Sequence, residues 1–247
     1  MTDFQRHDNI GQEWEGRNLE EYLDNVKEKA IGWLNVPLEI APPIGMGFIS
    51  HPFFNSPFAQ DKKGIFSMLT DRERAEGVIN GIEDTISRQD SIHGVLCLIN
   101  KPYRIDFLKE LFEEGGIDKK TCGNELGQIW PMLENNDSTD DETKEIMLDW
   151  LLSADKEVIM DENDLKAYMT LPEQVTVYRG MQPGESVKGF SWSLDLSTAE
   201  WFSKRFSNDG KVYSTVVNKK DIIAYINSRA EQEVILNYKI INEPVLL

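Results

Sequence analysis

The run Val175-Thr176-Val177-Tyr178 is the first of several short β-branched stretches, and it marks a change in the character of the chain. Similar stretches follow at residues 212–217, 221–225, 234–238 and 245–247. Short runs that are rich in β-branched and aromatic residues are typical of strands. The sequence after Pro172 therefore predicts a small sheet.

One helix is expected within this sheet region, at residues 198–206. Ser197 could cap its first turn, because a serine hydroxyl accepts a hydrogen bond from the backbone there. Ala199, Phe202 and Phe206 recur at helical spacing, so we expect them to face inward.

Before residue 171 the apolar residues recur mainly at helical spacing. The capping pairs Asn18-x-x-Glu21 and Thr70-x-x-Glu73 mark two helix starts. The pattern predicts helices at residues 18–34, 70–86, 105–112, 117–133, 140–153 and 162–169. Residues 37–60 carry five prolines and four phenylalanines, so we expect a long ordered loop packed by its aromatic rings. The chain is thus predicted to be an α+β protein, with a mainly helical region at residues 1–170 packed on a sheet region at 171–247.

The net charge of −17 is uneven along the chain. Residues 171–247 hold nine basic and nine acidic side chains, whereas the first 170 residues hold 17 basic and 34 acidic ones. Such an acidic surface repels phosphate backbones, so nucleic acid is not expected as a partner, and we ascribe the charge mainly to solubility. The chain has neither a membrane-length apolar run nor a hydrophobic stretch at its polar start, which predicts a cytoplasmic protein with no membrane partner.

Two cysteines, Cys97 and Cys122, and three histidines lack the spacing of metal ligands. We therefore expect neither a metal site nor a disulfide framework. Gly45-Met46-Gly47 is likewise not a dinucleotide fingerprint, because no strand, third glycine and helix surround it.

Glu231-Gln232-Glu233 stands at the head of a predicted strand. Side chains alternate along a strand, so both carboxylates would share one face. Such a pair can stabilise an oxocarbenium-like centre while one member handles the proton of an incoming nucleophile. Taken alone, the same pattern also fits a solvated strand face.

Two further motifs carry polar groups at strand ends. Arg179 is followed by Gly180, and a guanidinium suits phosphate oxygens while glycine lets a ligand approach the backbone. Ser191-Trp192-Ser193 would place two hydroxyls on one side of an extended segment. Taken alone, these would be a surface arginine before a turn and a polar strand face. The serine run is not a nucleophile elbow, because G-x-S-x-G is not matched.

In this order, Tyr178-Arg179-Gly180, Gly189-Phe190-Ser191-Trp192-Ser193, Ala199-Glu200-Trp201-Phe202 and Glu231-Gln232-Glu233 resemble the Arg-Ser-Glu class of mono-ADP-ribosyltransferases. That family includes bacterial toxins and phage-encoded enzymes, and the resemblance covers residues 171–240. It implies a split-sheet catalytic core at residues 171–247, NAD as the substrate without a metal, and an arginine of a target protein as the acceptor.

The resemblance also implies a role for each residue. Arg179 would hold the NAD diphosphate, and Gly180 would offer backbone groups to the nicotinamide amide. Ser191 and Ser193 would line the NAD site, Ser191 supporting the nicotinamide-ribose pocket. Glu233 would be the catalytic glutamate, and Glu231 would engage the acceptor guanidinium.

Two departures from the family pattern stand out. Its usual Ser-Thr-Ser reads Ser-Trp-Ser here, and the loop at residues 227–230 lacks the aromatic residue with which many relatives grip a protein target. Two alternatives stay open: an NAD glycohydrolase toxin, in which water replaces the acceptor, and a non-catalytic binding protein that keeps the fold.

Overall fold

The computed structural model describes residues 19–247 apart from 38, 45, 57, 61–62, 70–71 and 134–139. It combines helices with a six-stranded antiparallel sheet, which confirms the predicted α+β class. The chain divides into two compact units, Met1–Lys119 and Lys120–Leu247, which are described in turn.

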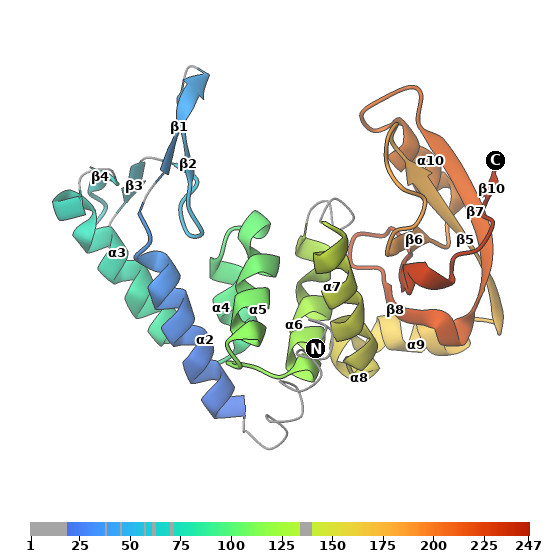
Figure 1. Cartoon of the computed structure of the whole chain (residues 1–247), viewed down its shortest axis with the longest axis horizontal. Coiled ribbons are helices and arrows are strands. Elements are labelled where there is room, and N and C mark those ends of the chain that lie inside the picture. Colours follow the sequence, from blue (N-terminus) through green and yellow to red (C-terminus); the bar gives the residue numbers. More distant parts are fainter. Residues whose placement is uncertain are drawn as a thin grey trace. The chain divides into compact units, whose positions relative to one another are not determined.

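The first unit consists of helices and two hairpins (Figure 1). The helices are α2 (Leu19–Leu34), α3 (Arg72–Ser87), α4 (Ile92–Leu98) and α5 (Arg104–Glu113), with the 3-10 turn η1 (Lys101–Tyr103) before α5. The hairpins pair β1 (Glu39–Ile44) with β2 (Met46–Ser50) and β3 (Phe58–Gln60) with β4 (Phe66–Met68). Helix α2 buries Tyr22, Val26, Ala30 and Leu34, which recur every fourth residue on one face.

The predicted helices at 18–34, 70–86 and 105–112 are confirmed as α2, α3 and α5. The residues expected to cap the first two, Asn18 and Thr70, lie outside the described residues. Helix α4 has no counterpart in the prediction; the Ser91 hydroxyl caps it by accepting a hydrogen bond from the Gly94 amide at 3.2 Å.

The expected loop at residues 37–60 is wrong in part, because strands β1, β2 and β3 form within it. Pro42 and Pro43 lie inside β1, and the pairing register with β2 shifts between Ala41 and Ile44. Proline has no amide hydrogen to donate to the ladder, so the strands pair on either side of the two prolines and not through them.

The second unit begins with helices and continues into the sheet (Figure 1). The helical elements are α6 (Lys119–Ile129), η2 (Trp130–Met132), α7 (Asp141–Ser153), α8 (Lys156–Ile159) and α9 (Glu162–Thr170). They confirm the predicted helices at 117–133, 140–153 and 162–169, whereas the short helix α8 was not expected. Asp140 and Asp161 cap α7 and α9 by accepting hydrogen bonds from backbone amides of the first turn.

The predicted strands are all present in one sheet. They are β5 (Gln174–Met181), β6 (Ser191–Ser193), β7 (Lys211–Asn218), β8 (Ile222–Ile226), β9 (Glu233–Leu236) and β10 (Val245–Leu246), with η3 (Lys219–Asp221) and η4 (Tyr238–Ile240) between them. The strand order is β10-β7-β5-β6-β9-β8. β5 pairs with β7 along its whole length, but it meets β6 only at Tyr178 and Ser193. The sheet is therefore two three-stranded halves joined at a single residue pair.

Helix α10 (Leu196–Lys204) packs directly on the backbone of β5. A Cβ added at Gly180 would lie 1.9 Å from the carbonyl oxygen of Ala199, so no larger residue fits beneath the helix. Close packing of α10 therefore accounts for a glycine at this position, and the expected contact of its backbone with a ligand stays a prediction. Two details of the predicted helix are wrong: Asp195 caps it in place of Ser197, and Phe206 lies beyond its end, 77% exposed.

Within the second unit the helices end at Thr170 and the strands begin at Gln174, and the two compact units divide between residues 119 and 120. Helices α8 and α9 pack against strand β8. The Lys156 ammonium group in α8 donates hydrogen bonds to the carbonyl oxygens of Ile222 and Ile223 at 2.5 and 3.0 Å. Helices α6–α9 therefore belong with the sheet.

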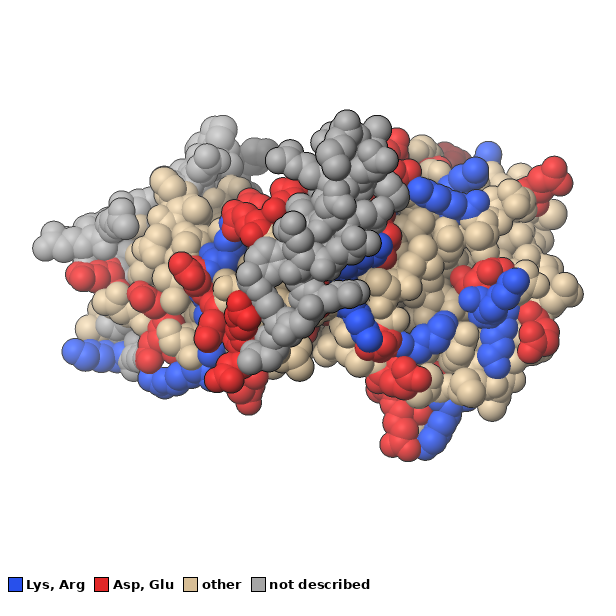
Figure 2. All heavy atoms as spheres, turned by 60° about the horizontal axis from the view of Figure 1, so that its bottom comes forward, with Lys and Arg blue, Asp and Glu red and all other residues tan. Residues whose placement is uncertain are grey.

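The surface carries charges of both signs. Figure 2 shows acidic and basic side chains interspersed over the face that it presents. Within the described part of the chain, no helix is long and apolar enough to cross a membrane. Nor does any group of three or more His, Cys, Asp or Glu side chains among those residues form a possible metal site.

Candidate active site

Glu233 is a buried carboxylate held by fixed donors. It is the first residue of β9 and is 6% exposed. The Trp130 indole Nε1 donates to Glu233 Oε1 at 3.0 Å, and the Ser191 hydroxyl is a second donor. Burial raises the pKa of Glu233, and the hydrogen bonds from Ser191 and Trp130 and the charge of Arg229 oppose that rise. The site thus holds a desolvated carboxylate whose ionised form depends on these partners.

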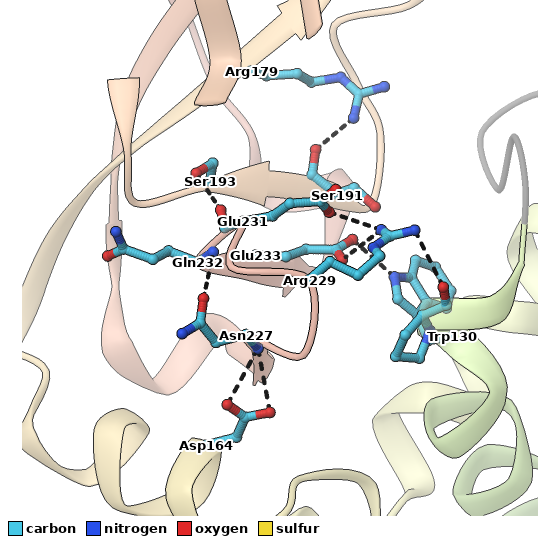
Figure 3. Close-up of polar contacts among 11 residues, drawn as sticks. Trp130, Asp164, Arg179, Ser191, Ser193, Asn227, Arg229, Glu231, Gln232 and Glu233 are labelled. Atoms are coloured by element: carbon cyan, nitrogen blue, oxygen red, sulfur yellow. Dashed lines mark hydrogen bonds and ion pairs between the residues drawn. The ribbon is translucent and has the colours of Figure 1, made fainter. Parts of the chain in front are cut away.

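Ser191 connects Glu233 to Arg179 across the junction between the two halves of the sheet. Arg179 lies on β5 and is 8% exposed, and its Nη1 donates to the carbonyl oxygen of Ser191 at 2.5 Å. The same serine bonds Glu233 through its hydroxyl. Figure 3 shows the guanidinium of Arg179, Ser191 and the two glutamates arranged in this order.

A turn, and not the alternation of side chains along a strand, brings the Glu231 side chain to the site. It precedes β9, and both Ala230 (φ 56°) and Gln232 (φ 46°) have left-handed backbone conformations. The expected alternation along a strand is therefore wrong at this point. The turn is closed by Asn227, whose Oδ1 accepts from the Gln232 amide at 3.0 Å and whose carbonyl oxygen accepts from the Ala230 amide at 2.8 Å. Asp164 on α9 in turn accepts from the Asn227 amide at 3.2 Å.

Ser193 supports this turn from the neighbouring strand. Its hydroxyl donates to the Glu231 carbonyl oxygen at 2.7 Å and accepts from the Asp195 amide at 2.9 Å. Trp192, the middle residue of the Ser-Trp-Ser run, is buried and donates from Nε1 to the Gly189 carbonyl oxygen at 3.1 Å. In the described structure Ser193 therefore fixes the backbone that carries Glu231, and Trp192 packs in the core.

Arg229 joins the two carboxylates. Its Nη2 lies 2.8 Å from Glu231 Oε2 and 3.5 Å from Glu233 Oε2. Its Nη1 donates to the carbonyl oxygen of Pro131 at 3.1 Å. Figure 3 shows the guanidinium between the two glutamates and Trp130. The carboxylate pair thus holds a guanidinium that the chain itself supplies.

Sequence reasoning identified Arg179, Ser191, Glu231 and Glu233, and the structure brings these four together. It missed Trp130 and Arg229. Trp130 stands 103 residues before Glu233 and packs edge-on against Phe190 with ring centroids 5.5 Å apart, a contact without any local signal. Arg229 was visible as a basic residue two positions before Glu231, but its direction depends on the turn.

A cavity of about 340 Å³ opens beside Glu231. Its other lining residues, Ser197, Thr198, Trp201 and Phe202, all lie on α10, and Trp201 is 56% exposed. A larger cavity of about 440 Å³ is lined only by residues of the first unit and contains none of the residues above. We take the smaller cavity as the candidate ligand site, because a polar group beside aromatic walls is typical of such sites.

Comparison with models of protein families, with curated proteins and with solved structures finds no match for this chain. A buried carboxylate with fixed donors can stabilise a nearby cation, and a second carboxylate can orient a guanidinium nucleophile.

Proposed function

We propose that the chain is a mono-ADP-ribosyltransferase that cleaves NAD and transfers ADP-ribose to an arginine of a target protein. One observation carries the proposal: Arg179, Ser191, Glu233, Arg229 and Glu231 form a continuous line of polar contacts at the junction of the split sheet. A guanidinium suited to diphosphate stands at one end of this line, and a carboxylate pair that already holds a guanidinium stands at the other.

Glu233 would act on the nicotinamide ribose. When the bond between ribose and nicotinamide breaks, positive charge develops on the ribose, and a fixed carboxylate stabilises that charge mainly in the transition state. Trp130 and Ser191 hold Glu233 in place, so the group needs little reorganisation at that moment. The low exposure of Glu233 strengthens its electrostatic effect, because little water screens it.

Glu231 would act on the acceptor. A free arginine side chain is protonated and is a poor nucleophile until a carboxylate orients it and helps to remove a proton. The 2.8 Å pair between Arg229 and Glu231 supports this role, because the carboxylate already binds one guanidinium. The cavity beside Glu231 supports the approach of an external side chain, with Trp201 and Phe202 as apolar walls.

Arg179 would bind the NAD diphosphate. Its guanidinium is planar and matches phosphate oxygens in a way that lysine cannot. Its bond to the Ser191 carbonyl oxygen fixes its direction and couples diphosphate binding to the strand that carries Ser191. No metal is required in this scheme, because the leaving nicotinamide is neutral once it departs.

The decisive experiment measures nicotinamide release and label transfer in one preparation. The full chain is incubated with labelled NAD and the arginine mimic agmatine, and then with lysate proteins. We expect both nicotinamide and labelled agmatine from the wild type. Glu233→Gln should form both products at least about a hundredfold more slowly. Glu200→Gln, a matched control on the exposed face of α10, should behave like the wild type.

The alternatives give different outcomes in this assay. Nicotinamide release without any labelled acceptor would identify an NAD glycohydrolase. A folded wild-type chain that releases no nicotinamide would overturn the enzymatic proposal and favour a binding protein.

A further inference from the structure

We propose that the chain modifies itself and that Arg229 is the first arginine to receive ADP-ribose. This inference rests on the proposed function, and it names an acceptor for the same site. It starts from a single juxtaposition: Arg229 Nη2 lies within 3.5 Å of carboxylate oxygens of both Glu231 and Glu233.

Arg229 meets the requirements of an acceptor. Glu231 orients its guanidinium, as transfer to arginine requires. Its Nη1 is anchored on the Pro131 carbonyl oxygen, which leaves Nη2 as the nitrogen directed at the carboxylate pair. The side chain is 46% exposed, so the site is open to solvent where a ribose would have to join it.

The turn holds Arg229 in this position. Left-handed backbone at non-glycine residues costs energy, and both Ala230 and Gln232 adopt it. Hydrogen bonds from Asn227 and Ser193 keep the turn closed in spite of that cost. A nucleophile that is fixed beside the reacting centre reacts at a much higher effective concentration than one arriving from solution.

The step balances without any further reactant. The bond between C1 of the nicotinamide ribose and the nicotinamide nitrogen breaks, and its electron pair leaves with neutral nicotinamide. The Arg229 Nη2 lone pair forms the new bond to that carbon. The guanidinium gives up one proton, which Glu231 accepts and passes to solvent.

The product would limit the enzyme. ADP-ribose on Arg229 places a diphosphate, two negative charges, beside Glu231 and Glu233, where like charges repel. It would also occupy the position that an external guanidinium needs. We therefore expect nicotinamide release to begin with a fast phase that approaches one molecule per chain and then to slow down.

The test uses the full chain and NAD alone, followed by intact-mass measurement and peptide mapping. We expect a mass increase of one ADP-ribose unit, located at Arg229. Arg229→Lys keeps a positive charge but lacks the guanidinium, so its self-label and its fast phase should both be lost. Arg88→Lys is the matched control, because Arg88 is an exposed arginine paired with Asp84 in the first unit, and it should label like the wild type.

Two further measurements sharpen the result. Each protein is compared with itself before and after preincubation with NAD and removal of the excess. The wild type should lose transfer to agmatine, whereas Arg229→Lys should keep whatever rate it had before preincubation. A tagged Glu233→Gln chain mixed with active wild type should stay unlabelled, because the reaction takes place within one chain.

The outcomes separate this inference from the proposed function. Nicotinamide release and labelled agmatine with no label on the chain would overturn self-modification, and a label on another arginine of the chain would overturn the assignment of Arg229. Both outcomes would leave the transferase intact. Labelling of the tagged inactive chain would overturn the reaction within one chain. Absence of nicotinamide release would overturn both proposals.

Discussion

Replacement of Glu233 by glutamine should lower activity while leaving stability intact or improved. Glutamine has the same shape, and its carbonyl oxygen can still accept from Trp130. The negative charge is lost, however, and removal of one preorganised electrostatic group typically costs about 2.7–4 kcal/mol of transition-state stabilisation, or roughly a hundred- to thousandfold in turnover. We expect that loss in nicotinamide release.

The effect on stability runs in the opposite direction. Burial raises the pKa of Glu233 in the folded state, so the folded protein favours the protonated carboxyl over the ionised one. The protonated carboxyl therefore stabilises the fold at low pH, and this stabilisation is lost as the pH rises through the folded pKa. Glutamine does not titrate. The variant should therefore gain stability relative to the wild type as the pH increases.

Three measurements check this reasoning. Nicotinamide release gives turnover, calorimetric titration gives the affinity for NAD, which should change little, and thermal unfolding at acidic and alkaline pH gives the stability difference. A folded Glu233→Gln protein with near-normal nicotinamide release would refute the catalytic assignment. A variant whose relative stability declines as the pH rises would refute the electrostatic argument.

Four other substitutions test neighbouring parts of the structure. Arg179→Ala should weaken NAD binding by about 1.5–3 kcal/mol, the usual contribution of hydrogen bonds to charged groups; an unchanged dissociation constant in calorimetry would make the residue purely structural. Glu231→Gln should abolish transfer to agmatine while slow NAD hydrolysis continues, and an equal loss of both rates would contradict the acceptor role. Trp130→Phe removes a donor that lowers the pKa of Glu233, so the acid limb of the profile of kcat/KM against pH should move to higher pH; an unmoved limb would show that the indole does not tune this carboxyl. Burial raises the pKa of Glu125 from 4.5 to about 7, so its contribution to the free energy of unfolding, roughly 3 kcal/mol, should be present below pH 4.5 and lost above pH 7. Glu125→Gln should remove that loss in denaturant titrations, and a variant as pH-sensitive as the wild type would contradict the assignment.

Local signals predicted most of the regular structure. The stripe Tyr22, Val26 and Ala30 identified α2, because spacing along the chain alone decides which face is apolar. The strands after Pro172 were likewise visible as β-branched runs. Strand β1 was not predicted, because Pro42 and Pro43 are typical of a loop. The residue pairs with β2 on either side of these prolines nevertheless form a hairpin.

The site was predictable only to the extent that its residues share a strand or a motif. Arg179, Ser191 and Glu233 lie on strands whose polar ends could be read from the sequence. Trp130 and Arg229 act through contacts that depend on how distant segments pack, and no spacing rule reports such contacts. The predicted direction of the Glu231 side chain was obtained for the wrong reason, because the left-handed conformation of Gln232 interrupts the expected alternation of side chains along the strand.

The place of Trp130 in η2, directly after α6, determines how much of the chain a minimal fragment must contain. A fragment that starts at residue 171 would keep both glutamates but would lose the indole donor to Glu233, the Pro131 anchor of Arg229 and the Asp164 support of the turn. Lys156 and its two bonds to the backbone of β8 would be lost as well. A fragment that starts at Lys120 retains all of these groups and coincides with the second compact unit. The helices before the sheet are thus part of the site's own framework, and truncation experiments should treat residue 120, not 171, as its natural beginning.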